Sequence, residues 1–218
     1  AFEQPASVSV RVNPFKPGAE KEGVPVAWNR HGRMMDHRPV FTLDPLFHAG
    51  AYYVQDSSSM FPGYVFRELM SRIDRPQGRP FRVLDLCAAP GGKSFTIAQT
   101  AGDDCTVIAC DLHSSRVDLI ADGARRLGLD SVKARRRDAA AEGSKIIADR
   151  VLCDVPCSGL GVIRRKPDIK NKSRSELDAL PELQYKILTT NAACVKPGGR
   201  IVYSTCTLNS AENAGVFD

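Results

Sequence analysis

The sequence predicts an α/β protein with a doubly wound, mainly parallel sheet. From residue 81 to residue 205, apolar runs of strand length alternate with segments in which apolar residues recur at helical spacing. This alternation favours a parallel sheet, because parallel strands need long crossover connections. Polar or reactive side chains also follow one expected strand after another, and the carboxyl edge is where open α/β sheets bind ligands. Both patterns therefore indicate a sheet that binds a ligand at one edge.

Residues 1–54 differ from this pattern and predict a small β-rich N-terminal appendage. The segment from Ser7 to Val12 alternates polar and apolar residues like a half-buried strand, and Asn13-Pro14 ends it. Further strand is expected between Val24 and Val40, with a turn at His31-Gly32.

Residues 55–80 predict one helix followed by a linker. Asp56 and the serines after it are residue types that cap helices, and the apolar residues that follow recur at helical spacing as far as Ile73. A segment rich in proline, from Arg75 to Pro80, then breaks the chain before the larger domain.

Residues 81–218 predict the larger domain. Its expected elements are a strand at 81–87, a helix at 94–101, a strand at 105–111, a helix at 114–128, a strand at 132–136, a helical stretch at 139–147, a strand at 149–154, a long helix within 176–196, a strand at 200–205 and the start of a helix at 210–217.

The composition is that of an ordinary globular protein, with 43% hydrophobic and 25% charged residues. No apolar stretch approaches the roughly 18 residues of a membrane helix, and no signal segment begins the chain, so a cytoplasmic monomer without a membrane partner is expected. The odd number of cysteines, seven, favours reduced thiols over a disulfide scaffold. No Cys-x2-Cys pair is present and the four histidines are scattered, so we expect no metal site.

The net charge of +5 is mild, but the basic residues gather in two clusters. One cluster lies between Lys133 and Arg137, where an exposed strand face is an equally good interpretation. The other extends from Arg164 to Arg174, shortly after Cys157. A polyanion bound to this second cluster would present its bases to the reactive edge of the sheet.

Three of the expected strands are followed by carboxylates that are candidate ligand contacts: Asp111, Asp138 and Asp154. Asp111 stands roughly 20 residues beyond the glycines of the first loop, where an acidic residue binds ribose hydroxyls in dinucleotide folds. Capping of the next helix is the alternative for Asp111. Asp138 is a candidate for the adenine edge, or for pairing with the arginines before it.

The loop after the first strand is not a phosphate-binding loop. A P-loop would need glycine at Cys87, and the dinucleotide pattern of three glycines is missing from Ala89 to Ser94. A nucleoside cofactor without phosphates, such as S-adenosylmethionine, remains compatible with this loop and the carboxylates after it.

Three motifs, in this order, resemble the Sun/Nop family of S-adenosylmethionine-dependent RNA cytosine-5 methyltransferases. They are Asp85 to Lys93, Asp154 to Gly159 and Ser204 to Leu208. The segment from Tyr53 to Met60 also resembles that family. Together with the segment from Ser7 it is similar to one bacterial branch, whereas residues 153–170 resemble another.

The resemblance implies a class I methyltransferase (Rossmann-like) fold, S-adenosylmethionine as donor and a cytosine in RNA as acceptor, with rRNA preferred over tRNA. It implies that the cofactor site is lined by Cys87, Ala88, Ala89, Pro90, Gly91, Gly92, Lys93, Asp111, Arg116, Asp138 and Asp154. It also implies that Cys206 is the nucleophile and that Cys157 assists the release of the product.

The chemistry of cytosine explains a requirement for thiols. Carbon 5 is a poor nucleophile, but a thiolate that adds to carbon 6 makes carbon 5 enamine-like. A free thiol is only about 3% ionised at neutral pH. A pKa of Cys206 lowered to about 7 would therefore increase the fraction of reactive thiolate, and Lys93 is a candidate cause of such a shift. Asp154 is the candidate for the N3/N4 edge of the base. It would need a proton or a bridging donor to serve N3, since a plain carboxylate only accepts hydrogen bonds.

The class I sheet continues beyond the strand expected at 200–205, so we expect the last two strands to be absent and the chain to be a fragment or a shortened form. Two other functions fit parts of the pattern. A small-molecule methyltransferase would keep the loop and the carboxylates but has no need for both cysteines. An RNA-binding fragment without activity would keep the basic cluster.

Overall fold

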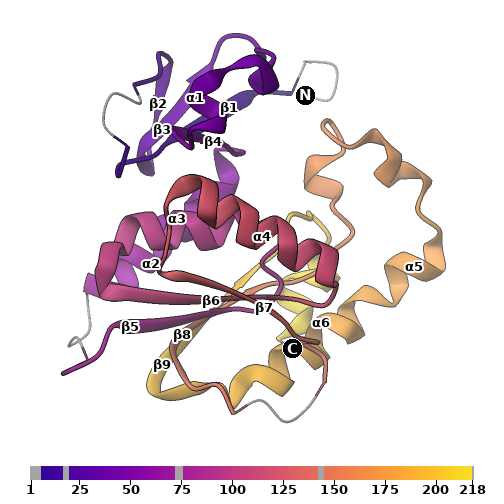
Figure 1. Cartoon of the computed structure of the whole chain (residues 1–218). Coiled ribbons are helices and arrows are strands. Elements are labelled where there is room, and N and C mark those ends of the chain that lie inside the picture. Colours follow the sequence, from indigo (N-terminus) through magenta and orange to yellow (C-terminus); the bar gives the residue numbers. More distant parts are fainter. Residues whose placement is uncertain (1–5, 17–19, 72–75, 142–144, 218) are drawn as a thin grey trace.

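The computed structural model describes residues 6–16, 20–71, 76–141 and 145–217. A small antiparallel sheet lies above a larger parallel one, and a helix passes between them (Figure 1). The figure shows this helix, α3 (Gly92–Ala101), under strand β4 (Tyr52–Val54) and above the strands of the large sheet.

The small sheet has the order β2-β3-β1-β4, formed with β1 (Val8–Val12), β2 (Val24–Val26) and β3 (Asn29–Met35). The turn expected at His31-Gly32 is wrong, because both residues lie inside β3 and the chain turns at residues 27–28 instead. Gly32 serves packing: a Cβ there would collide with Val26 and Met60.

The large sheet is parallel, with the order β7-β6-β5-β8-β9. Its strands are β5 (Phe81–Asp85), β6 (Cys105–Asp111), β7 (Val132–Arg136), β8 (Ala148–Asp154) and β9 (Val195–Ser204). The chain reverses its direction of winding between β5 and β8, and such a switch point is where doubly wound sheets bind ligands. The predicted fold class is confirmed.

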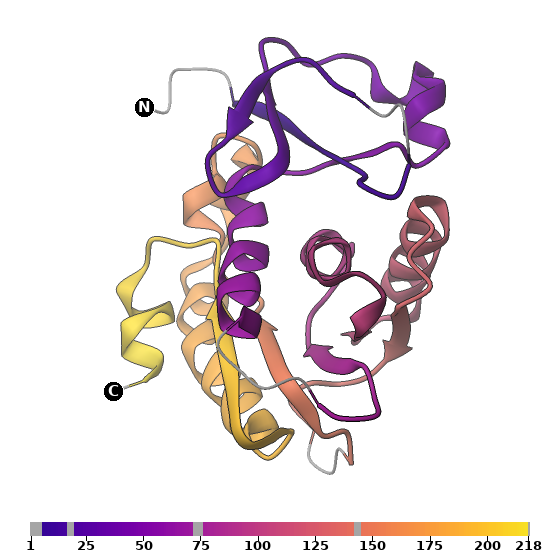
Figure 2. The ribbon, with the colours of Figure 1, turned by 90° about the vertical axis from the view of Figure 1, so that its left-hand side faces the viewer.

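Helices cover both faces of this sheet. One face packs on α2 (Phe61–Ser71), α3 and α4 (Ser114–Leu127), and the other on α6 (Leu180–Ala192). Figure 2 shows the sheet strands lying between these groups. The shorter elements are the helices α1 (Pro45–His48) and α5 (Arg174–Asp178) and the 3₁₀ turns Phe41–Leu43, Ser58–Met60, Gly102–Asp104, Leu160–Val162 and Pro167–Asn171.

Two expected helices are wrong. No helix forms in the described parts of 139–147, where Asp138 accepts a hydrogen bond from the backbone N–H of Ala140 at 2.8 Å and favours a turn. Residues 142–144 and Ile73, the last residue of the helix expected before the linker, lie outside the described residues. The segment 210–217 forms two 3₁₀ turns, Ser210–Glu212 and Ala214–Val216, rather than the start of an α-helix.

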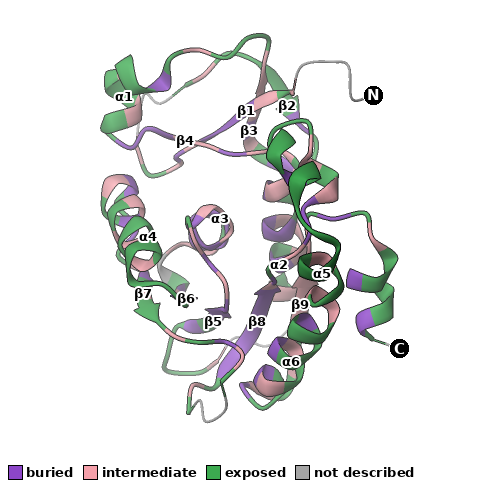
Figure 3. Ribbon diagram, turned by 90° about the vertical axis from the view of Figure 1, so that its right-hand side faces the viewer, coloured by how far each residue is buried: buried purple, intermediate pink, exposed green. Residues whose placement is uncertain are grey.

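Arg11 joins the small sheet to the larger domain. Only 2% of its surface is exposed, although the alternating pattern of β1 predicts a solvent-facing position. Its Nε donates to Gln99 Oε1 at 2.7 Å, and a second nitrogen donates to Thr96 and to the carbonyl of Gly92. Burial lowers the pKa of Arg11 to about 9. The polar face of β1 therefore packs against α3. Figure 3 shows α3 below the strands of the small sheet.

Candidate active site

The loops after β8 and β9 bring two cysteines together. Asp154 and Ser204 are paired in register, so the segments that follow them leave the sheet side by side. The Sγ atoms of Cys157 and Cys206 lie 3.2 Å apart, and the backbone N–H of Cys206 donates to Cys157 Sγ at 3.3 Å. Cys206 is exposed and Cys157 half-buried, so the pair is open to a substrate. The other five cysteines are free thiols, as the sequence predicts. Cys87 is half-buried, and Cys105, Cys110, Cys153 and Cys194 are buried.

Polar contacts behind the cysteines hold the two loops in place. Ser158 Oγ and Thr207 Oγ1 are 2.6 Å apart, and Glu212 accepts the backbone N–H of Ser158 at 2.8 Å. Glu212 is fully buried and also accepts from Gln184 at 2.9 Å and from Asn209 at 3.1 Å. Burial by itself would raise the pKa of this carboxyl, but these donors outweigh burial and lower it. Sequence reasoning missed Glu212, because nothing in its neighbourhood distinguishes it from a surface acid of a helix.

The two thiols have opposite acidities. A hydrogen bond from the Cys206 thiol lowers the pKa of Cys157 to about 6, against burial and with help from the backbone N–H groups of Cys206 and Gly159. The same hydrogen bond, followed by burial and the charge of Cys157, raises the pKa of Cys206 above its usual range. The expectation of a lowered pKa at Cys206 is therefore wrong for this geometry. The contact therefore makes Cys157, rather than Cys206, the sulfur that loses its proton more readily.

Lys93 and Asp154 form an ion pair beside the cysteines. Lys93 follows the glycines of the first loop and its Nζ lies 2.8 Å from the carboxylate of Asp154 at the end of β8. Burial lowers the pKa of Lys93, but the Asp154 carboxylate more than compensates and the pKa is raised. The charge of Lys93 opposes the rise in the pKa of Cys206, so this candidate cation does act on the thiols.

The loop between β5 and α3 has the conformation that its small residues predict. Gly91 adopts φ +105 at the start of α3, a left-handed conformation that disfavours side chains, and an added Cβ would collide with Phe95. Beside this loop, Asp85 is fully buried and burial raises its pKa to about 7. Its Oδ2 accepts from Ser94 at 2.6 Å, whereas Oδ1 has no partner among the described residues.

Asp111 lies at the end of β6, next to the same loop. It accepts weakly from the backbone N–H groups of Ala89 at 3.3 Å and His113 at 3.4 Å, and Arg116 lies 3.5 Å from it. Arg116 also donates to the carbonyl of Ala89 at 3.2 Å. The residue that caps α4 is His113, without a side-chain capping bond, so Asp111 does not occupy the capping position itself.

Asp138 follows β7, the strand next to β6, two residues beyond the register partner of Asp111. It is exposed after β7, and within the described ranges it forms no ion pair with the arginines before it.

The residues of the second basic cluster make different contacts. Arg165 pairs with Asp56 at 2.7 Å and so connects the loop to the N-terminal part of the chain. Lys172 lies 3.5 Å from the carbonyl of Cys157.

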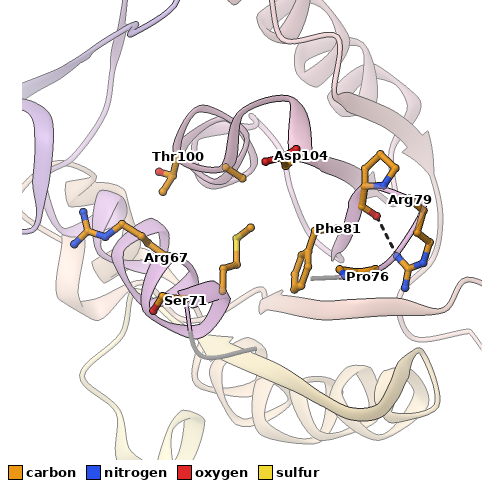
Figure 4. A pocket seen from close by; sticks show the side chains of 10 residues that line it. Arg67, Ser71, Pro76, Arg79, Phe81, Thr100 and Asp104 are labelled. Carbon is orange, nitrogen blue, oxygen red and sulfur yellow. Dashed lines mark hydrogen bonds between the residues drawn. The ribbon is translucent and has the colours of Figure 1, made fainter. Parts of the chain in front are cut away.

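A cavity of about 470 Å³ lies at the opposite edge of the sheet, between the ends of α2 and α3 and the start of β5 (Figure 4). Figure 4 shows Phe81 and Arg79 at this edge, so the cavity belongs to a different surface from the cysteines.

In the described part of the chain no three metal-ligating side chains cluster, and no helix is long and apolar enough to cross a membrane.

Two family models match the chain. The model of the 16S rRNA methyltransferase RsmB/F matches residues 75–218, and that of the N-terminal domain of 16S rRNA methyltransferase RsmF matches residues 1–57. The chain belongs to the RsmB/F family of 16S rRNA methyltransferases. The resemblance inferred from the three motifs is confirmed.

Relatives from both branches of the RsmB/F family are similar to the chain. A probable ribosomal RNA small subunit methyltransferase B of Bacillus subtilis is 44% identical over 175 residues, covering 78% of this chain and 37% of its own. A probable methyltransferase B of Synechocystis is 36% identical and covers 97% of this chain and 49% of its own. The methyltransferase F of an Enterobacter strain is 31% identical and covers 99% and 47%. The chain thus spans about half the length of the curated relatives it matches.

Solved structures have a similar fold over the part that this chain covers. A methyltransferase homologue from Pyrococcus horikoshii has a TM-score of 0.80 at 28% identity and covers 99% of this chain and 70% of its own. NSun6 from the same organism, solved with SFG, has a TM-score of 0.69 at 30% identity and covers 85% and 45%. Membership of the family confirms S-adenosylmethionine as the cofactor. The buried acceptor Asp85 Oδ1 fits a cofactor that carries ammonium and hydroxyl donors.

Proposed function

We propose that the chain methylates carbon 5 of a cytosine in RNA through a covalent bond between Cys206 and carbon 6. The observation that carries this proposal is the 3.2 Å contact between the sulfurs of Cys157 and Cys206 at the carboxyl edge of the sheet. Neither a methyltransferase for small molecules nor a simple RNA-binding module needs two thiols at this distance. Ribosomal RNA is the proposed substrate, because the relatives above are named for it.

A proton shared by the thiols allows Cys206 to attack although its pKa is raised. As Cys206 approaches carbon 6, the Cys157 thiolate accepts its proton, and the sulfur–carbon bond forms with the electron pair of Cys206. The electron pair of the ring's carbon 5–carbon 6 double bond then forms a double bond between carbons 4 and 5, and the pair of the carbon 4–N3 double bond moves to N3. Lys93 then gives a proton to N3 and takes up the proton of Cys157, which leaves the ring neutral and carbon 5 enamine-like. Cys157 is again a thiolate.

S-adenosylmethionine supplies the activated methyl group. Once carbon 5 carries both a hydrogen and the methyl group, the Cys157 thiolate removes that hydrogen as a proton. The Cys206–carbon 6 bond then breaks, its electron pair returns to Cys206, and the proton on N3 is released. The pair ends as it began, with one proton between two sulfurs.

Asp154 and Lys93 are proposed to orient the base. Because Asp154 is paired with Lys93, it acts as a carboxylate and accepts from the exocyclic amine of cytosine. Lys93 provides the donor that Asp154 lacks and lies where it also stabilises negative charge on Cys206. The bridging donor that the sequence required for N3 is therefore proposed to be Lys93.

The cofactor contacts proposed from the sequence fit the arrangement of the strand ends. We assign the ribose hydroxyls to Asp111, the adenine edge to Asp138, and the rest of the cofactor to the loop from Cys87 to Lys93, with Arg116 holding the backbone of Ala89. The exposed lysines of the cluster from Arg164 to Arg174 are proposed to bind phosphates of the RNA.

Methyl transfer to cytosine-containing RNA, with labelled S-adenosylmethionine, tests the proposal. Labelled RNA that yields 5-methylcytosine on digestion is the expected result. Binding of RNA and S-adenosylmethionine without any transfer would favour an RNA-binding fragment. Transfer to a free nucleoside as efficient as transfer to RNA would favour a small-molecule methyltransferase.

A further inference from the structure

A second hollow lies where the small sheet meets α2 and α3. Its volume is about 230 Å³, and it lies outside the cofactor and cysteine loops. Its walls come from three elements that are distant in the sequence: the turn and start of β3, the first half of α2 and the end of α3. The lining residues are Trp28, Asn29, Arg30, His31, Gly63, Tyr64, Arg67, Gln99 and Thr100.

Two aromatic rings, Trp28 and Tyr64, line this hollow, and Phe61 connects them without being part of its wall. Trp28 meets Phe61 edge to face at 6.0 Å, and Phe61 stacks on Tyr64 at 5.7 Å. The indole of Trp28 is fixed by a hydrogen bond of 2.7 Å to the carbonyl of Ser57. Phe61 is 47% exposed, so the strip of three rings reaches solvent. Such a strip is a surface on which planar rings stack.

The hollow is basic. Arg30 and Arg67 line it and no acidic residue does. Arg67 lies over the ring of Tyr64 at 4.9 Å, and Arg30 donates to His31 Nε2 at 2.8 Å. Burial and the neighbouring charges of Arg30 and Arg33 lower the pKa of His31, so its ring is neutral at physiological pH. An anionic group would be attracted by the two guanidinium groups, of which Arg67 also pairs with the exposed Glu68 at 3.4 Å.

Gln99 supplies a hydrogen-bond donor without an acceptor. Its side chain is 94% buried, since 6% is exposed, and it lines the hollow. Its Oε1 accepts from Arg11 Nε, and because arginine only donates, this contact fixes which end of the amide is oxygen. The remaining Nε2 has no partner among the described residues. A buried donor of this kind is costly unless a ligand satisfies it.

The size of the hollow restricts the ligand to one monomer unit of a longer polymer. Cavities that enclose whole small molecules start at about 300 Å³, and this hollow is smaller. Arg67 and Thr100 also line the larger cavity of Figure 4, where they lie on the side of the indigo N-terminal strands. The hollow thus adjoins the larger cavity, which neighbouring units of a bound polymer could occupy.

The hollow adjoins the basic loop. Asp56 binds Arg165 of that loop, and the next residue, Ser57, binds Trp28. A strand of RNA that leaves the cysteines along the loop therefore reaches the hollow without crossing the molecule.

We infer that the hollow binds one unpaired nucleotide of the RNA, with its base on the strip of Trp28, Phe61 and Tyr64. An acceptor on the base edge takes the hydrogen bond of Gln99 Nε2, and the flanking phosphate lies between Arg30 and Arg67. The inference rests on the proposed function in taking RNA as the ligand.

Trp28 is the only tryptophan of the chain, so its fluorescence reports on the hollow directly. Titration with a short single-stranded RNA should quench this emission to saturation. Tyr64→Ala should weaken the binding at least about fivefold, the effect of losing one stacked base. Arg30→Ala changes an exposed side chain and tests the hollow without disturbing the packing of α2. Tyr185→Ala and Arg125→Ala, exposed positions on α6 and α4, are the matched controls.

Two results would overturn the inference. One is unchanged Trp28 emission while anisotropy of labelled RNA shows that the RNA is bound. The other is equal quenching and equal sensitivity to Tyr64→Ala with inorganic tripolyphosphate, which would make the hollow a simple anion site. Methyl transfer measured in parallel separates this inference from the proposed function: quenching without transfer contradicts only the proposed function, and transfer without quenching contradicts only the hollow. Cys206→Ala should lose transfer and keep the quenching.

Discussion

Glu212 accepts a hydrogen bond of 2.8 Å from the backbone N–H of Ser158, the residue after Cys157. The two residues are separated by 54 positions in the sequence and belong to the segments that carry the two cysteines. The buried carboxylate therefore links the loop of Cys157 to the segment after Cys206, and it holds both sulfurs at their contact distance.

Replacing this carboxylate should loosen the pair. All three partners of Glu212 are donors, so Glu212→Gln places an amide N–H against a donor and leaves a buried group unsatisfied. We expect a loss of about 1–3 kcal/mol in the free energy of unfolding, measured by urea denaturation. The exposed Glu182→Gln on α6 is the control. Equal stability of Glu212→Gln and the control would show that the carboxylate does not hold the loops.

Single variants should distinguish the attack by Cys206 from the proton removal by Cys157. Cys206→Ala should abolish transfer without a covalent product, because the attacking sulfur is gone. Cys157→Ala also removes the hydrogen bond and the charge that raise the pKa of Cys206, so Cys206 can still ionise and attack. This variant should accumulate protein bound to methylated RNA, because the proton on carbon 5 is no longer removed. Denaturing electrophoresis detects the adduct, and Cys157→Ala/Cys206→Ala should lack it. An adduct that requires Cys157 and persists without Cys206 would reverse the roles.

The low pKa of Cys157 should be visible in its alkylation. A lowered pKa means that the thiolate is present above about pH 6 and is lost as the pH falls through that value. The rate of iodoacetamide labelling at Cys157, followed by peptide mass spectrometry, should therefore rise with an inflection near pH 6. Cys206→Ala removes the donor and should move the inflection towards about 8.5, the value of a free thiol. An inflection near 8.5 in the unaltered protein would contradict the shared proton.

Asp111 should contribute to cofactor binding. If it holds the ribose hydroxyls, Asp111→Ala should weaken S-adenosylmethionine binding by about 1–3 kcal/mol in isothermal titration, the scale of a lost charge-assisted hydrogen bond. Asp118→Ala, exposed on α4, is the matched control. Unchanged affinity in a folded Asp111→Ala protein would restrict Asp111 to its contacts with the backbone of the loop.

Different residues of the basic loop should contribute to RNA binding and to stability. Lys166→Ala/Lys170→Ala should weaken RNA binding and flatten its dependence on salt by about 0.7 for each phosphate that is no longer neutralised, since fewer counterions are released. Lys186→Ala on α6 should leave the slope unchanged. Arg165→Ala should instead lower stability, because Arg165 binds Asp56 and the carbonyl of Ser7. An unaltered slope in the double variant would exclude this loop as the RNA contact.

The sequence by itself determined the fold class, the alternation of strands and helices along the larger domain and the identity of the loops at its carboxyl edge. Parallel strands joined by helices leave few arrangements, and Cys157 and Cys206 each follow an apolar strand, so both had to emerge at one edge. The glycines after β5 and the acid after β6 follow from the same rule. Local patterns failed at 210–217, where the tertiary contacts of Glu212 replace a helix, and at His31-Gly32, where close packing rather than a turn requires glycine.

Tertiary structure alone decided how the site works. The alternation in β1 predicts that Arg11 faces solvent, yet α3 buries it, because the two segments meet only after the small sheet has docked. The hydrogen bond that makes Cys157 the more acidic thiol joins residues 49 positions apart, and Glu212 acts across a similar separation. Periodicity and motifs report on neighbours within a few residues, whereas a pKa depends on every donor and charge that folding brings within a few ångströms.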